Sequence, residues 1–214
     1  MPIPSPTPIY RIIHVDNLKL YLERGKIHSP NDDPKDGLEY RTIHDENIQS
    51  ARREWTIPCG PKGVLHDYVP FYFGTRSPML LRLKTGRVLH YHEGQEPIIY
   101  LVSSVQTILQ EGYNFVFSDG QGIKRFTSWY CREEDLGMLD WNCIHARRWN
   151  DTTGEPDRMR RKQAEFLIHR QCDWSVIKKI GVLNENMRNK VEIIMNEYST
   201  NKHRPVELSH QWYY

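Results

Sequence analysis

The sequence has no apolar run that approaches the roughly 20 residues needed to span a bilayer. Its first residues, MPIPSPTP, have neither the basic nor the apolar region of a signal peptide. Its 4 cysteines include no pair with CxxC spacing and are too sparse for a disulfide framework in a chain of 214 residues. We therefore expect a cytoplasmic protein with reduced thiols and no membrane association.

An excess of charge of one sign is also missing. The 29 Lys and Arg residues against 27 Asp and Glu give a net charge of +2, so any basic surface must come from local clustering. Hydrophobic residues make up 38% of the chain and charged residues 26%, which excludes wholesale disorder. The length suits one large domain.

The motifs of common nucleotide sites and metal sites are absent or incomplete. No P-loop occurs, and Gly120 and Gly122 are followed by Arg125 where GxGxxG needs its third glycine, so a Rossmann site is unsupported. A zinc deaminase would need a second thiolate after Cys59, where Lys62 stands. The two histidines of HYHE (90–93), His90 and His92, could lie on one face of a strand, but no second pair of metal ligands stands at a recognised spacing from them. The sequence therefore predicts no metal site.

What the sequence does contain predicts a single α+β domain with a mixed sheet. Strands are expected over 9–14, 64–73, 97–104, 115–120, 164–169 and 177–183, and helices over 16–24, about 39–54, 105–111 and 185–198. Residues 1–8 alternate proline with small residues, which predicts a flexible arm before a domain over 9–214. Pro70 inside a predicted strand favours an edge strand or a bulge.

One carboxylate stands out. Glu165 lies in KQAEFLIHR, at the start of an apolar strand that follows a long basic segment. A carboxylate fixed in a low-dielectric setting can stabilise a developing cation. A buried glutamate is more often simply paired with Arg or Lys, so the residues alone favour a structural role.

The segment before Glu165 is the most basic part of the chain. Between residues 145 and 170 lie seven bases against four acids, and Trp149 is interleaved with them; the bases are Arg147, Arg148, Arg158, Arg160, Arg161, Lys162 and Arg170. Guanidinium groups bind phosphates and aromatic faces stack on bases, so this segment suits single-stranded nucleic acid. A solvated loop with core tryptophans is the alternative, and it is the commoner case.

Five further positions have two interpretations each. Arg52 and Arg53 close a polar helix, where they could clamp a pyrophosphate or only complement the helix dipole. His14 ends the first strand and could orient a ribose hydroxyl or an amide, although a strand-end histidine is more often structural. Tyr21 and Tyr72 could stack on a planar ring or belong to the core.

Several stretches together resemble the DarT family, the DNA ADP-ribosyltransferase toxins of bacterial toxin–antitoxin systems. The most specific stretch is LHDYVPFYF, followed closely by RSPML. The matching segments are 8–18, 63–73, 76–80, 96–104, 115–120, 139–141, 162–168 and the closing WYY. The resemblance thus covers nearly the whole chain.

The resemblance implies an ADP-ribosyltransferase fold, a split mixed sheet with flanking helices that cradles NAD without a Rossmann motif. It implies a toxin that moves ADP-ribose from NAD, as substrate and without a metal, to a base of single-stranded DNA, with release of nicotinamide. Thymine is the expected base. A DarG-like macrodomain antitoxin would be the partner, and we expect a monomer.

The resemblance also implies roles for individual residues. Glu165 falls on the family's catalytic glutamate and Arg52 on its catalytic arginine, with the adjacent Arg53 as the alternative. With the two stacking candidates, the expected NAD contacts are Ile12, Ile13, His14, Tyr21, Arg52, Tyr72 and Met79. The expected DNA contacts lie in a substrate-recognition loop over about 124–165 and are Trp149, Arg147, Arg148, Arg160 and Arg161.

Two functions of other classes remain open at this point. A ribonuclease toxin could use His66, Glu165 and the arginines, and it would cleave nucleic acid without NAD. A non-catalytic single-strand binding module would use only the aromatic and arginine side chains, and it would keep its function in Glu165→Ala. The chain has no signature of the common single-strand binding folds, which makes the module the weaker alternative.

Overall fold

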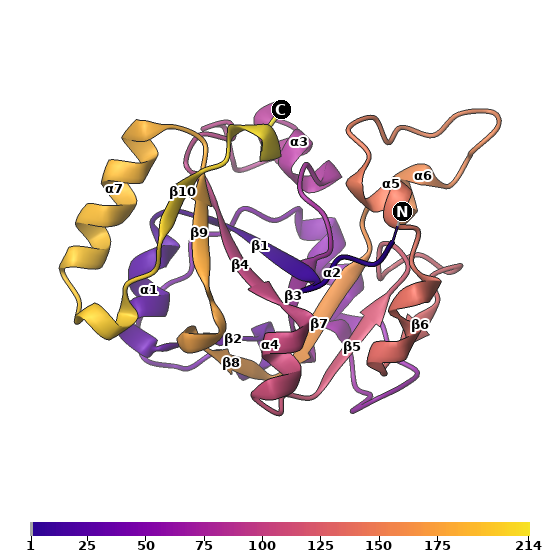
Figure 1. The fold of residues 1–214 in the computed structure, drawn as a ribbon, viewed down its shortest axis with the longest axis horizontal. Helices are drawn as coiled ribbons and strands as arrows, with labels where there is room; N and C mark the ends of the chain where they lie inside the picture. The colour runs from indigo at the N-terminus through magenta and orange to yellow at the C-terminus, as the bar shows by residue number, and fades with distance from the viewer. Residues whose placement is uncertain (1) are drawn as a thin grey trace.

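A computed structural model of the chain describes residues 2–214, and Met1, the first residue of the predicted arm, lies outside the described residues. The strands are β1 (Pro8–His14), β2 (Lys26–His28), β3 (Tyr68–Tyr72), β4 (Ile98–Ser104), β5 (Phe115–Ser118), β6 (Trp129–Tyr130), β7 (Glu165–His169), β8 (Gln171–Asp173), β9 (Lys179–Val182) and β10 (Val206–Leu208). The helices are α1 (Asn17–Arg24), α2 (Glu46–Glu54), α3 (Pro78–Lys84), α4 (Val105–Gln110), α5 (Trp141–His145), α6 (Arg158–Arg161) and α7 (Glu185–Asn196). The helices pack around one large sheet (Figure 1).

The sheet is mixed and split into two halves. Its eight strands have the order β10-β9-β4-β1-β3-β7-β5-β6, and β2 pairs separately with β8. β10 runs parallel to β9, and the other neighbours are antiparallel. β1 pairs with β4 along its whole length, but it meets β3 at a single register pair, Tyr10 with Tyr72. The two halves are therefore joined at one point, as the predicted split sheet requires.

Pro70 shows how β3 tolerates this split. The prediction of an edge strand is wrong, because β3 lies inside the sheet between β1 and β7. The N–H and C=O of one strand residue point toward the same neighbour, so the missing donor of Pro70 faces the side to which its carbonyl points. That carbonyl accepts a hydrogen bond of 3.0 Å from Nη1 of Arg11 on β1. The proline thus faces the opening between the halves, where no ladder bond is lost.

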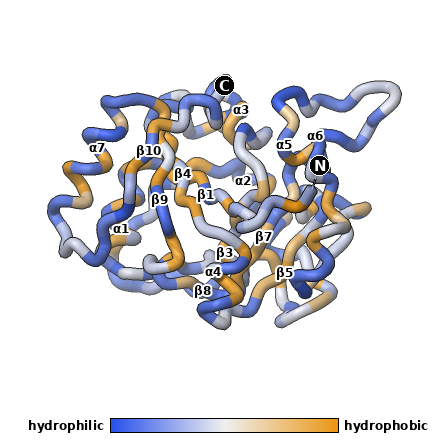
Figure 2. Tube along the Cα trace, in the orientation of Figure 1, coloured by the Kyte–Doolittle hydropathy of each residue, from blue (hydrophilic) through white to orange (hydrophobic). Residues whose placement is uncertain are grey.

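The two faces of the sheet bury different side chains. Ile13 belongs to the large core under α1, α4 and α7, whereas Ile12 belongs to a smaller cluster with α3 and the C-terminal residues. Figure 2 shows hydrophobic residues along the central strands and hydrophilic segments around them. Because side chains alternate along a strand and register partners share a face, Ile12, Tyr72 and Glu165 all point to the side of the smaller cluster.

Local sequence explains most element boundaries. α1 ends at Gly25, whose left-handed φ of 65° suits glycine, as predicted. The helix expected over about 39–54 begins only at Glu46, because the Asp45 side chain accepts hydrogen bonds from the first free N–H groups of α2. The three-residue strands β2, β8 and β10 were not predicted, since such short segments show no periodicity.

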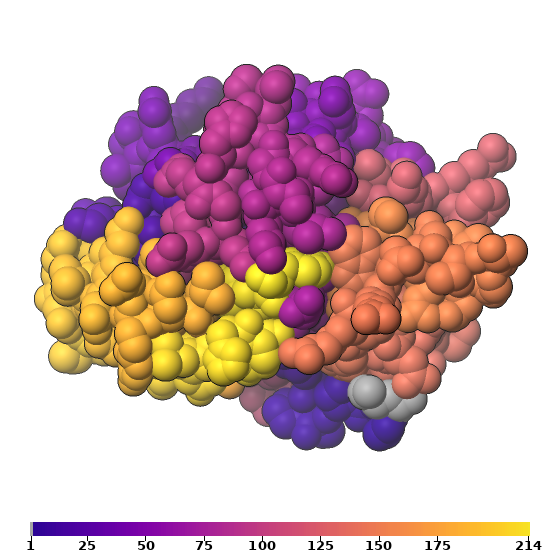
Figure 3. Space-filling model, turned by 90° about the horizontal axis from the view of Figure 1, so that it is seen from above, coloured from indigo at the N-terminus to yellow at the C-terminus, as the bar shows by residue number. Residues whose placement is uncertain are grey.

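Both ends of the chain are tied to the domain. Thr7 is fully buried, and its N–H donates to Oε1 of Gln106 at 2.8 Å, so the predicted arm is fixed at its C-terminal end. At the other end, the Tyr213 hydroxyl donates to the Ile98 carbonyl at 2.7 Å. Figure 3 shows these last residues, in yellow, between the magenta segment around α3 and the orange segment between α5 and α6.

Lys162 is a buried cation whose titration should be visible in the stability of the fold. Its Nζ donates to the carbonyls of Ile144 at 2.5 Å and Ala146 at 3.1 Å, which ties the end of α5 to the segment before β7. Burial lowers its pKa from 10.5 to about 8. Between these values the unfolded chain binds more protons than the folded one, so stability rises with pH in this window.

We expect the free energy of unfolding to rise, between pH 7 and pH 10, by roughly 2 kcal/mol more in the wild type than in Lys162→Met. Urea unfolding curves of both proteins at each pH would measure this difference. Parallel pH profiles of the two proteins would show that Lys162 is not the group responsible.

Candidate active site

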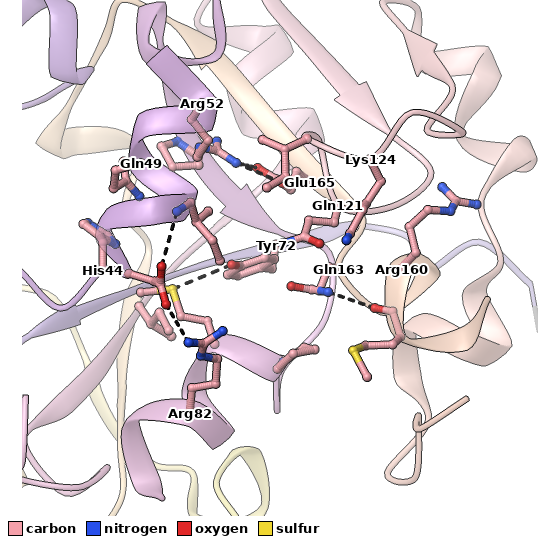
Figure 4. Close-up of a pocket in the computed structure, with 18 of the residues that line it drawn as sticks. His44, Gln49, Arg52, Tyr72, Arg82, Gln121, Lys124, Arg160, Gln163 and Glu165 are labelled. Atoms are coloured by element: carbon pink, nitrogen blue, oxygen red, sulfur yellow. Dashed lines mark hydrogen bonds and ion pairs between the residues drawn. The ribbon is translucent and has the colours of Figure 1, made fainter. Parts of the chain in front are cut away.

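Arg52 and Glu165 meet although 113 residues separate them. Nη1 of Arg52, in the last turn of α2, lies 2.8 Å from Oε2 and 3.1 Å from Oε1 of Glu165, the first residue of β7. Both residues are buried, with 8% and 3% of their surface exposed. Figure 4 shows the contact at one end of a cavity. The ion pair that the sequence offered as a structural explanation is thus present, and it lies in a cavity wall.

Glu165 is held from a second side by the last residue of β5 and by the segment after it. The N–H of Gly122 donates to Oε1 at 2.9 Å, and the N–H of Glu165 donates to the Ser118 hydroxyl at 3.3 Å. A Cβ at position 122 would lie 3.3 Å from Oε1 and as close as 3.2 Å to the Leu65 side chain, so a side chain there would crowd the carboxylate. The anion is therefore fixed before any ligand binds.

Arg52 is held by the helix that carries it. Asp45 caps α2 and also accepts a hydrogen bond of 2.5 Å from Nη2 of Arg82 on α3, which anchors the helix at its start. Nη2 of Arg52 is buried and has no hydrogen-bond partner among residues 2–214. A buried unsatisfied donor is costly in a protein that binds nothing there. It suits an acceptor atom on a ligand.

The pair forms part of the wall of a cavity of about 750 Å³. Of the residues predicted from the sequence, Ile12, Tyr72, Met79 and Arg160 also line it. The Tyr72 hydroxyl donates toward Sδ of Met79 at 3.7 Å. Burial, and then the charge of Glu165, raises the pKa of Tyr72 above its ordinary value, so this phenol stays protonated. The cavity combines the fixed carboxylate of Glu165 with further charged side chains of both signs and with apolar surface.

A second cavity of about 570 Å³ adjoins the first. The two share five lining residues, Arg11, His44, Gln49, Arg52 and Pro70. The second cavity is further lined by aromatic and basic side chains, including Tyr21, Tyr40, Arg53 and His66. Arg52 therefore stands where the two cavities meet.

Two residues at this junction were not predicted from the sequence. Arg11 is 8% exposed and has no carboxylate partner among residues 2–214; its Nη2 donates to the Tyr21 hydroxyl at 3.2 Å, and its Nε is buried without a partner. His44 stacks on Tyr40 with ring planes 3° apart. Loss of water, and then the charges of Arg11 and Arg52, lower the pKa of His44 to about 3, so its ring is neutral. The sequence held a signal for Arg11, because it is the single arginine in the apolar strand IYRIIH.

Comparison with known proteins places this arrangement in a family. The family described as "ssDNA thymidine ADP-ribosyltransferase, DarT" matches residues 10–214. This chain belongs to the DarT family. The DNA ADP-ribosyl transferase of Thermus sp. (strain 2.9) is 40% identical to it over 211 residues, which cover 99% of this chain and 98% of that protein. A transferase–glycohydrolase fusion protein of Thermosipho africanus is 23% identical over 88% of this chain and 45% of the fusion.

Solved DarT structures agree with the sequence match. Thermus sp. 2.9 DarT in complex with ADP-ribosylated ssDNA aligns with a TM-score of 0.94 and 39% identity over 100% of this chain and 99% of that one. The complex of the same protein with NAD+ aligns with a TM-score of 0.89 and 38% identity over the whole of both chains. These findings confirm the predicted ADP-ribosyltransferase fold and the predicted NAD-dependent DNA ADP-ribosyltransferase activity, with NAD as substrate.

Three predicted NAD contacts do not line the larger cavity. Ile13 points to the opposite face of the sheet and is fully buried in the core. His14 is 1% exposed; its Nδ1 accepts from the N–H of Asp16 at 3.2 Å, and its Nε2 lies 3.5 Å from the Glu93 carboxylate. Tyr21 lines the second cavity instead. Their roles toward NAD stay predictions.

The predicted DNA contacts divide into paired and free cations. Arg160 is paired with Asp119 at 2.6 Å and Asp157 at 2.8 Å, and Arg161 is paired with Asp140. Arg147 and Arg148 are exposed, without an ion pair in the part of the chain that the structure describes. They lie at the start of the loop between α5 and α6, which projects from the body of this DarT family member (Figure 1).

Trp149 is buried, with 8% exposure, and its Nε1 donates to the Tyr214 hydroxyl at 2.8 Å. This placement fits a brace between the loop and the C-terminus better than a platform for a base. We expect Trp149→Phe to lower the free energy of unfolding by about 1 kcal/mol, from the lost hydrogen bond, and to leave KM for an oligonucleotide unchanged. A raised KM at unchanged stability would instead assign Trp149 to DNA binding.

Within residues 2–214, no three His, Cys, Asp or Glu side chains are grouped so as to hold a metal ion. No helix in the same range has the length and apolar composition to cross a membrane.

Proposed function

We propose that this chain transfers ADP-ribose from NAD+ to thymine in single-stranded DNA, with Glu165 and Arg52 as its catalytic residues. The observation that carries the assignment of residues is their buried contact in the wall of the larger cavity, in a member of the DarT family. Arg53, the alternative for the catalytic arginine, is exposed and lines only the second cavity.

The two cavities fit the two halves of NAD. Arg11, at the junction, is buried and its Nε has no partner among residues 2–214, and a guanidinium group suits a pyrophosphate. A dinucleotide bent at its pyrophosphate would place one nucleoside in each cavity. Ile12, Tyr72 and Met79 give the larger cavity an apolar wall for its half. Ile13 and His14 would then act only by fixing β1.

Glu165 supplies the negative charge that the reaction needs. Cleavage of the bond between nicotinamide and ribose leaves a developing positive charge on the sugar, as in glycoside hydrolysis. The carboxylate is held by Arg52 and by the N–H of Gly122, so it need not reorganise when this charge develops. A carboxylate oxygen can also accept a hydrogen bond from the ribose 2′-hydroxyl.

Arg52 acts on the acceptor side. The N3 of thymine carries a proton that must pass to solvent water before or as the new bond forms, while the leaving nicotinamide takes the electron pair of the broken bond. A guanidinium has a pKa above about 12 and is a poor base, but it stabilises a deprotonated base next to it. The unpartnered Nη2 of Arg52 is the donor available for this role.

A DarG-like antitoxin is the proposed partner of this toxin. Support comes from the Thermosipho africanus relative, in which a DNA ADP-ribosyl transferase is fused to a DNA ADP-ribosyl glycohydrolase. An enzyme that marks DNA and an enzyme that removes the mark form a natural pair. We further propose that the chain acts as a cytoplasmic monomer without membrane association.

The nuclease alternative has weaker support. His66 is hydrogen-bonded to Gln49 through Nε2 at 3.1 Å, and it lines the second cavity, whereas Glu165 lines the first. The two side chains proposed for acid–base chemistry therefore do not share one cavity. The binding-module alternative leaves the buried Arg52–Glu165 contact without a role.

The test is to incubate the protein with NAD+ and short single-stranded oligonucleotides that contain one thymine or none, followed by mass spectrometry. We expect the mass of one ADP-ribose on thymine-containing DNA only, lost without NAD+ and in Glu165→Ala. Glu207→Ala, which removes an exposed glutamate on β10, is the matched control. Adducts on thymine-free DNA would refute the choice of base, and cleavage without NAD+ would establish the nuclease.

A further inference from the structure

Phe126 is an exposed aromatic residue at the mouth of the larger cavity. It is 84% exposed, the highest value among the large hydrophobic side chains exposed in residues 2–214. Of that group, only Phe126 and Met159 line this cavity. A single exposed apolar side chain is common on protein surfaces, but a phenyl ring that lines a substrate cavity is placed to contact what binds there.

The loop that carries Phe126 is held firmly. The N–H of Lys124 donates to the Gln121 carbonyl at 3.0 Å, and the N–H of Thr127 donates to the Lys124 carbonyl at 2.9 Å. The Thr127 hydroxyl donates to the Gln121 carbonyl at 2.7 Å, and the N–H of Gln121 donates to the Arg160 carbonyl at 3.0 Å. Two consecutive turns therefore present Phe126 from a braced loop. Arg160, predicted as a DNA contact, here supports that loop.

The charges beside Phe126 are free. Lys124 and Arg125 are exposed, line the cavity and have no ion pair in the described part of the chain. They differ in this from Arg160 and Arg161, whose guanidinium groups are neutralised by aspartates. Figure 4 shows Lys124 and Gln121 at the cavity, between Glu165 and Arg160. An aromatic face next to unpaired cations is the combination that binds single-stranded nucleic acid.

We propose that Phe126 is the stacking platform for the base of a nucleotide next to the modified thymine, with Lys124 and Arg125 on the adjoining phosphates. This inference rests on the proposed function and adds a DNA subsite to it. The same loop contacts the carboxylate of Glu165 through the N–H of Gly122. Four residues of chain span at most about 14 Å, so a base on Phe126 belongs to a near neighbour of the reacting nucleotide.

Stacking on a phenyl ring is tolerant of base identity, so this subsite contributes affinity and strand position rather than choice of sequence. It also accounts for single strands as substrate, because a base within a duplex has no free face to offer.

The test measures binding and transfer in the same samples. A labelled oligonucleotide with one thymine is titrated with the protein, and binding is followed by fluorescence anisotropy. Two more oligonucleotides are titrated in the same way; one has an abasic site on the 5′ side of the thymine and the other on its 3′ side. We expect Phe126→Ala to weaken binding of the intact oligonucleotide about 10-fold, to raise KM for DNA equally and to leave KM for NAD+ unchanged. Phe126→Trp should restore binding. Ile193→Ala, which removes an exposed apolar side chain on α7, is the control.

The abasic oligonucleotides decide whether a base is the partner. The wild type should lose about the same 10-fold on one of them, and Phe126→Ala should lose nothing further on that one. The inference would be overturned if, on both abasic oligonucleotides, Phe126→Ala weakened binding as much as it does on the intact oligonucleotide. It would also be overturned if Phe126→Ala bound the intact oligonucleotide within twofold of the wild type. Binding that depends on Phe126 without any transfer would refute the proposed function alone, and transfer without dependence on Phe126 would refute the subsite alone.

Discussion

Glu165→Gln should lower the rate of ADP-ribose transfer at saturating NAD+ and DNA by at least about 100-fold, since loss of one preorganised electrostatic partner costs 10²–10³ in rate. The amide has nearly the shape of the carboxylate, and its oxygen can still accept from the N–H of Gly122. What disappears is the negative charge that faces the sugar. Single-turnover measurement of labelled ADP-ribose on the oligonucleotide isolates this step.

The control for Glu165→Gln must separate catalysis from stability. Removal of one partner from a buried ion pair leaves Arg52 without its counter-charge and can cost about 3–5 kcal/mol of folding stability. Urea unfolding and NAD+ binding of the variant are therefore measured beside its rate, with Glu207→Gln as the exposed counterpart. A folded Glu165→Gln that transfers at more than a tenth of the wild-type rate would remove Glu165 from the mechanism.

Periodicity predicted much of the sheet, because its strands are apolar and well separated by turn residues. The strands β3, β4, β5, β7 and β9 lie within the ranges expected from the sequence, and β1 begins one residue earlier than expected, at Pro8, which was assigned to the arm. The failures have local causes. Pro70 indicated an edge strand because it has no N–H to donate to a neighbouring strand. In the structure it faces a gap inside the sheet, which exists because β1 and β3 pair at one position only. The sequence of β3 alone does not show this gap.

The active site could be predicted only in part. Glu165 was visible as a charged residue at the start of an apolar strand, and the family resemblance gave it a role. Its contact with Arg52 spans 113 residues and depends on how α2 lies against β7, which no local pattern encodes. Arg11 was visible as a polar residue in an apolar strand. It is available to a ligand because no carboxylate among residues 2–214 pairs with it, and only the packed structure reveals this.

The count of charges in a segment does not show which of its cations are free. The basic segment before β7 has an excess of arginines, but Arg160 and Arg161 form ion pairs with aspartates. One of these aspartates, Asp119, lies outside that segment. Burial likewise decided the position of Trp149, which bonds to Tyr214, 65 residues further along the chain. Two exposed cations that line the cavity without an ion pair among residues 2–214, Lys124 and Arg125, stand beside the exposed ring of Phe126, in a tripeptide too short for composition to reveal.

Arg52→Ala should abolish transfer, whereas Arg53→Ala should leave kcat within about twofold of the wild type. Of the two arginines, Arg52 contacts Glu165 and lines both cavities. Arg53 is exposed and lines the second cavity but not the first. If the second cavity holds one half of NAD+, loss of Arg53 should appear in KM for NAD+ rather than in kcat. The pair of adjacent variants thus serves as its own matched control.

Arg52→Lys distinguishes charge from geometry at this position. A lysine keeps the positive charge, but it cannot hold Glu165 with one nitrogen while presenting a second planar donor to the acceptor base. We expect binding of NAD+ to survive in large part and transfer to remain at least about 100-fold below the wild type, as for loss of one oriented donor. A lysine variant with full activity would mean that a point charge suffices and that the unpartnered Nη2 has no part in the reaction. Full activity in Arg52→Ala, with loss in Arg53→Ala, would move the catalytic role to the neighbouring residue.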